Sequence, residues 1–138
     1  MFETVVIATD TSTSAERAVA VALDLAERFD AGVHVLSVLE DGDPDHERAV
    51  RTTLARFAEE VDRPVTTAAR RGEPASTIVE YAEGVDADLV ATGTRGRDAP
   101  YSYHLGSVAE AVVQDCPLPV LTVRQLEGEA GAAGVEAA

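Results

Sequence analysis

Glycines and a serine recur near the end of the chain at a spacing that could bind a phosphate group. They lie in the segment GTRGRDAPYSYHLGS and are Gly93, Gly96, Gly106 and Ser107. Glycine lets the backbone approach a ligand without a Cβ atom in the way, and the unpaired N–H groups at a helix N-terminus favour an anion. Arg95 and Arg97 could add positive charge. The spacing is neither a Walker A motif nor a G-x-G-x-x-G fingerprint, so a surface loop without a ligand remains the alternative.

A carboxylate after the first apolar run is the second candidate. Asp10 follows the run TVVIAT and precedes TSTS. Its carboxylate could bind ribose hydroxyls or a phosphate-bound Mg²⁺. The alternative is an Asx turn or a helix cap, because the hydroxyl-rich stretch around it is typical of both.

The remaining reactive side chains do not indicate catalysis. His34, His46 and His104 lack the spacing of metal ligands, and Cys116 is expected to be a small buried residue rather than a nucleophile. No Ser-His-Asp or Cys-His arrangement is present. Two tyrosines share the glycine-bounded segment with His104 and could cover a ligand or anchor the loop; they are Tyr101 and Tyr103.

These candidates need a framework, and the hydrophobic pattern supplies one. Short β-branched runs alternate with segments of helical spacing, which predicts an α/β protein with a parallel sheet covered by helices on both faces. The expected strands are 4–9, 33–39, 64–69, 87–93 and 119–124, and the expected helices are 13–29, 45–61, 74–84 and 105–114. Pro74 is expected to open the third helix and Gly84 to close it.

The first two helices each have an apolar stripe that predicts their buried face. The stripe of segment 13–29 contains Ala15, Ala18, Val19, Ala22, Leu23, Ala26 and Phe29. That of segment 45–61 contains Ala49, Val50, Leu54, Phe57 and Val61. Ligands of open α/β sheets bind outside the carboxyl ends of the strands, so the segments after strands 1, 2 and 4 are the candidate site.

Composition limits the partners and the setting. The 138 residues suffice for one domain. The net charge is −14, and all 11 Lys and Arg positions are arginine. Such a surface repels nucleic acid and anionic membranes. It resembles surfaces adapted to a salt-loaded cytoplasm, where screening weakens self-repulsion. No signal peptide or membrane span is expected, which favours a cytoplasmic protein.

The assembled residues resemble the universal stress protein family. The likeness runs through VVIATDTSTSAERAVAVALDLA, GEPASTIVEYAEGVDADLVATGTRG and LGSVAEAVVQDCPLPVLTVR, which span roughly residues 2–124. Its ATP-binding subset has Gly, two residues, Gly, nine residues, Gly and then Ser or Thr, and the chain fits that pattern without a gap. The resemblance implies one domain over 1–124 with a Rossmann-like, five-stranded parallel sheet in the order 3-2-1-4-5. Residues 125–138 have no core pattern and are expected to form a disordered acidic tail.

The resemblance also implies a nucleotide site holding ATP with Mg²⁺ or Mn²⁺. Residues matching Thr9 and Asp10 would lie by the ribose and phosphates, and the backbone matching Val38 would meet adenine. Gly96, Gly106 and the residues after it would hold the triphosphate. The implied nucleotide-binding set is Ala8, Thr9, Asp10, Val38, Thr92, Gly93, Thr94, Arg95, Gly96, Arg97, Gly106, Ser107 and Val108. The metal would be held by the ATP phosphates and by Asp10.

Proteins of this family tend to dimerise through their last strand, so the resemblance implies a homodimer through Pro119 to Val123. An apolar edge strand is an aggregation hazard unless a symmetry mate covers it. We therefore expect an ATP-binding regulatory protein of the stress response, without a catalytic residue. The alternatives are a slow ATPase, with Arg95 or Arg97 stabilising the γ-phosphoryl charge, and a dimeric interaction protein that binds no nucleotide. Thr11, in place of a family glycine, and Asp98 favour the last.

Overall fold

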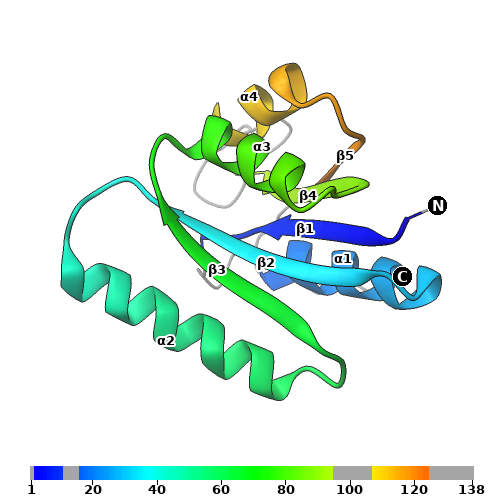
Figure 1. The fold of residues 1–138 in the computed structure, drawn as a ribbon, viewed down its shortest axis with the longest axis horizontal. Coiled ribbons are helices and arrows are strands. Elements are labelled where there is room, and N and C mark those ends of the chain that lie inside the picture. The colour runs from blue at the N-terminus through cyan, green and yellow to red at the C-terminus, as the bar shows by residue number, and fades with distance from the viewer. Residues whose placement is uncertain (1, 11–15, 95–106, 125–138) are drawn as a thin grey trace.

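The chain folds into alternating strands and helices. We analysed a computed structural model, which describes residues 2–10, 16–94 and 107–124 (Figure 1). The elements are β1 (Thr4–Ala8), α1 (Glu16–Phe29), β2 (Gly32–Leu39), α2 (Pro44–Glu60), β3 (Val65–Arg71), α3 (Pro74–Gly84), β4 (Leu89–Thr94), α4 (Ser107–Asp115) and β5 (Val120–Arg124). The predicted order of elements is thus confirmed. Within the described ranges, no helix has the length and apolarity that spanning a bilayer requires.

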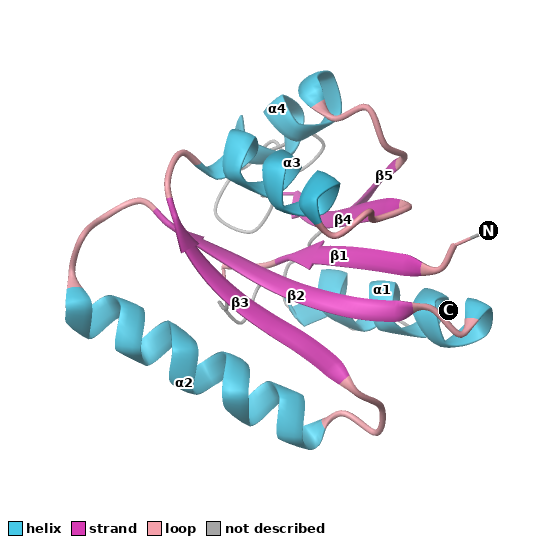
Figure 2. Ribbon diagram, viewed as in Figure 1, coloured by secondary structure: helices cyan, strands magenta, loops and turns pink. Residues whose placement is uncertain are grey.

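The five strands form one parallel sheet in the order β3-β2-β1-β4-β5, as predicted (Figure 2). β1 is the central strand, and Val6 lies opposite His34 of β2 and Val90 of β4. The run Val5 to Ala8 is buried throughout. A strand covered on both faces has no solvent side, which explains why β1 is apolar at successive positions.

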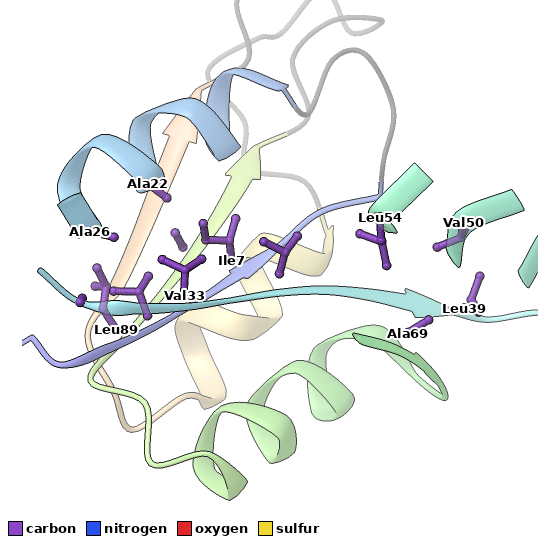
Figure 3. Close-up of a cluster of buried hydrophobic side chains, with 13 residues drawn as sticks. Ile7, Ala22, Ala26, Val33, Leu39, Val50, Leu54, Ala69 and Leu89 are labelled. Carbon is purple, nitrogen blue, oxygen red and sulfur yellow. The ribbon is translucent and has the colours of Figure 1, made fainter. Parts of the chain in front are cut away.

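Each face of the sheet has its own hydrophobic cluster. Val5 and Ile7 of β1 pack with α1 and α2 on one face, while Val6 and Ala8 pack with α3 and α4 on the other (Figures 1 and 3). Alternation along a strand sends successive side chains to opposite faces. The helix that follows β1, α1, and the helix that follows β4, α4, therefore cover opposite faces of the sheet.

Proline and an acidic cap begin both α2 and α3. The Asp43 carboxylate accepts a hydrogen bond from the Asp45 N–H at 2.9 Å, and Glu73 accepts one from the Ser76 N–H at 2.8 Å. Each cap satisfies a backbone donor that the helix itself cannot. The backbone hydrogen bond from Ser76 holds the pKa of Glu73 below its usual range. Pro74 opens and Gly84 ends α3 as predicted, but the left-handed residue in the turn that follows is Asp86, with φ 57°.

Some predicted core positions are wrong. Ala49 is exposed, because α2 covers the outer strands with the narrower stripe of Val50 and Leu54. Phe29 is 51% exposed at the end of α1, where its ring meets that of Phe2 in a T-shaped arrangement at a centroid distance of 5.2 Å. Cys116 is half-buried, not fully buried, beside the cluster under α4.

Candidate functional site

The end of β1 lies at the centre of the carboxyl edge of the sheet. Ala8 is buried, Thr9 is half-buried and Asp10 is exposed, so the chain passes from core to solvent within three residues. The Thr9 N–H donates to the Leu36 carbonyl at 2.9 Å. This bond extends the pairing with β2 one residue beyond β1 and fixes where Asp10 leaves the sheet.

A buried serine of the same strand, β2, forms a second bond to Thr9. The Ser37 hydroxyl donates to the Thr9 carbonyl at 2.6 Å, and Ser37 is 2% exposed. Both backbone groups of Thr9 are therefore bonded to β2. We did not predict a role for Ser37 from the sequence. The available signal was a lone hydroxyl within the apolar run VLSVL, since a buried polar group requires a partner.

The residues predicted from strands 1 and 4 are brought together. Ala8 and Thr92 are register partners between β1 and β4, and Thr92 is 6% exposed. Gly93 and Thr94 continue β4 toward the same edge, paired with Val123 and Arg124 of β5. The backbone of β4 thus reaches the carboxyl edge beside the end of β1.

Val38 approaches the edge from β2. Ala8 lies opposite Leu36, so Val38 is two residues further along and level with Asp10. Its side chain is half-buried against the cluster under α3 and α4, which leaves the backbone as the part of Val38 available at the edge.

The last residue of the glycine-rich segment 93–107, Ser107, begins helix α4. Ser107 is the first residue of α4 and is exposed, while Val108 is half-buried against the cluster below it. Ala109 and Val112 anchor α4 on the sheet. The first N–H groups of a helix have no intrahelical acceptor, and the helix dipole favours an anion there.

Several predicted residues lie outside the described residues. They are Thr11, Arg95, Gly96, Arg97, Asp98, Tyr101, Tyr103, His104 and Gly106, together with the tail 125–138. Within the described ranges, no group of three His, Cys, Asp or Glu side chains could hold a metal ion by itself. Asp10 is the acidic member of the predicted site.

The connections place this edge at a topological switch point. β1 and β4 are neighbours, but the helix that follows β1, α1, lies on one face of the sheet and the helix that follows β4, α4, lies on the other. Ligands of open α/β sheets bind at such points. The fold and this edge define an α/β protein with a candidate ligand site at the carboxyl ends of β1 and β4.

The chain belongs to the universal stress protein family, whose sequence profile matches residues 1–124. It is 38% identical to the Thermus aquaticus "Universal stress protein in QAH/OAS sulfhydrylase 3'region", over 90% of this chain and 100% of that one. A universal stress protein solved in complex with cAMP is similar at 28% identity and a TM-score of 0.71, over 90% of this chain and 98% of that one. The universal stress protein from Archaeoglobus fulgidus in complex with dAMP is similar at 25% identity and a TM-score of 0.73, over 90% and 100% respectively.

Proposed function

We propose that this chain binds an adenine nucleotide, ATP in the first place, at the carboxyl ends of β1, β2 and β4, and that it regulates a stress response. The observation that carries the proposal is the pairing of Ala8 with Thr92 at the switch point. It brings Asp10 and the end of β4 to one edge. The relatives solved with cAMP and dAMP support an adenine nucleotide as the ligand.

The proposed roles follow the position of each element. The backbone of Val38 meets adenine, since its side chain is engaged in the core. Thr9 and Asp10 lie by the ribose and phosphates, and Asp10 is exposed where it leaves the sheet. The start of α4 at Ser107, with Val108, Gly106 and Gly96, holds the triphosphate. Thr92, Gly93, Thr94, Arg95, Arg97 and Ala8 complete the set.

The donors at this edge fit a magnesium ion that arrives with the nucleotide. Asp10 offers one exposed carboxylate. Within the described ranges, no group of three His, Cys, Asp or Glu side chains could hold the ion without the nucleotide. Mg²⁺ is commonly bound by one or two carboxylates plus substrate phosphates and keeps several waters. Asp10 would then hold the ion against the phosphates, and the metal would neutralise part of their charge.

Calorimetric titration with ATP-Mg²⁺ tests the proposal. Wild type should bind one nucleotide per chain, while Gly106→Asp and Asp10→Ala should each lose affinity by at least about tenfold, or about 1.4 kcal/mol. Asp62→Ala is the matched control, because Asp62 is an exposed aspartate between α2 and β3, away from the site. The proposal fails if wild type binds neither ATP, dAMP nor cAMP at low or high salt, or if Asp62→Ala weakens binding as much as Asp10→Ala.

We also propose that β5 pairs with its copy in a homodimer through Pro119 to Val123. β5 is an edge strand, neighboured only by β4 within the described sheet. The Val90 N–H donates to the Pro119 carbonyl at 3.0 Å. Backbone groups alternate along a strand, so those of Val120 and Thr122 point away from β4 and are placed to bond a second copy.

A further inference from the structure

A pocket of about 340 Å³ opens between α1 and α2. The described residues that line it include none of α4. The two helices share a face of the sheet but diverge along it (Figure 1). In Figure 3 the labelled side chains of α1 (Ala22, Ala26) and of α2 (Val50, Leu54) lie at opposite ends of the cluster. Val35 of β2 contributes to the lining between them.

The lining is mainly apolar and only partly covered. Val19 and Leu23 of α1 and Phe57 of α2 line the pocket and are half-buried. Small-molecule sites in proteins have volumes of about 300–1,000 Å³ and predominantly hydrophobic walls. This volume equals that of roughly eleven liquid waters, which suits one or two rings and is too small for a helix or strand of a partner.

Uncharged polar groups of Thr9 and Thr53 in the lining are already bonded within the protein. The Thr53 hydroxyl donates to the Ala49 carbonyl at 3.0 Å. The N–H of Thr9 donates to Leu36, and its carbonyl accepts from Ser37. A ligand therefore finds few free donors or acceptors, and apolar contact must provide most of its affinity.

The two charged side chains that line the pocket have opposite signs. Arg56 and Glu60 both contribute to the lining and lie one turn apart on α2. Their opposite charges cancel locally, while the net charge of −14 repels anions at long range. The lining thus favours a neutral molecule over an anion such as a nucleotide.

We infer that the pocket between α1 and α2 is a second binding site, which takes a neutral, mainly apolar small molecule of one or two rings. It is separate from the start of α4, where a triphosphate would bind, and among the described residues it shares only Thr9 with the nucleotide edge. A ligand here would bridge α1 to α2 across the end of β1. The inference does not depend on nucleotide binding.

The test uses N-phenyl-1-naphthylamine, a neutral two-ring probe that fluoresces in apolar surroundings. Ala20→Phe and Thr53→Phe each add a ring to one wall of the pocket, and both positions are otherwise exposed. Val21→Phe and Thr52→Phe add the same ring one residue along, outside the lining. Urea unfolding midpoints verify that each variant is folded. The anionic analogue 8-anilinonaphthalene-1-sulfonate tests the role of charge.

We expect one probe per chain, a loss of at least about tenfold in affinity for both filling variants, and wild-type affinity for both controls. The anionic analogue should bind at least about tenfold more weakly, and saturating ATP-Mg²⁺ should not displace the probe. Methyl NMR shifts should appear at Val19, Leu23 and Val35, which also decides the matter should a filling variant not fold. Absence of binding, equal binding by all four variants, tight anion binding or displacement by ATP would each overturn the inference.

Discussion

Removal of the Ser37 hydroxyl should measurably destabilise the protein, although only one oxygen atom is lost. The hydroxyl donates to the Thr9 carbonyl at 2.6 Å, and Ser37 is 2% exposed. Water cannot readily replace the donor at so buried a position. The bond is part-buried, and loss of its donor should cost about 1–3 kcal/mol. For a domain of this size, about 2 kcal/mol lowers Tm by roughly 7 °C.

Urea unfolding followed by circular dichroism measures the effect on Ser37→Ala. Ser37→Cys keeps a side chain of similar shape with a weak donor, so its loss should be intermediate. Ser76→Ala is the matched control, because its hydroxyl bonds Glu73 at an exposed helix start, and it should cost under about 1 kcal/mol. The reasoning is refuted if Ser37→Ala is no more destabilising than Ser76→Ala at an unchanged m-value.

The same variant tests whether the end of β1 positions the nucleotide site. Thr9 precedes Asp10, and its two backbone bonds to β2 fix where Asp10 leaves the sheet. Ser37→Ala should therefore weaken dAMP binding by about threefold to tenfold, or about 0.7–1.4 kcal/mol. Ser76→Ala should bind dAMP as wild type does. If Ser37→Ala binds dAMP as tightly as Ser76→Ala, the hydrogen bond from Ser37 to Thr9 does not position the ligand.

Four further predictions concern the core, the charges and the edge strand. Leu36→Ala should cost about 2–5 kcal/mol in urea unfolding, because Leu36 is 0% exposed, while Val21→Ala at 38% exposed should cost far less. Burial lowers the pKa of His34, so the unfolded chain takes up a proton before the folded one, and stability should drop as pH falls through 6.5. His34→Gln should flatten that part of the profile. Thr122→Pro removes an outward N–H from β5 and should shift the dimer toward monomer in light scattering without unfolding it. Dialysis from concentrated KCl into dilute buffer should lower Tm, since the net charge is −14, and an unchanged Tm would contradict adaptation to salt.

The pH prediction rests on the surroundings of one side chain. His34 Nδ1 and the Tyr81 hydroxyl lie 2.8 Å apart, and the Arg70 guanidinium lies 5.3 Å from the centre of the Tyr81 ring. Burial also raises the pKa of Tyr81, which Arg70 opposes, so Tyr81 stays protonated across this range.

The elements could be predicted because their signals are local. The apolar run at β1 and Pro74 at the start of α3 each act within a few residues. The candidate site at Asp10 followed from the rule that ligands meet the carboxyl edge of such sheets, whereas Thr92 came with the family resemblance. The strand order came with the family resemblance, because alternation alone allows more than one arrangement.

By itself, the sequence determined the α/β class, the order of the strands and helices along the chain, and the edge that bears the candidate site. Only the tertiary structure decided that Ser37 bonds Thr9, that Ala49 is exposed, and that α1 and α2 diverge around a pocket. These features depend on strand register and on where each helix lies over the sheet. Both are set by contacts between segments far apart in sequence, so spacing within any one segment does not specify them.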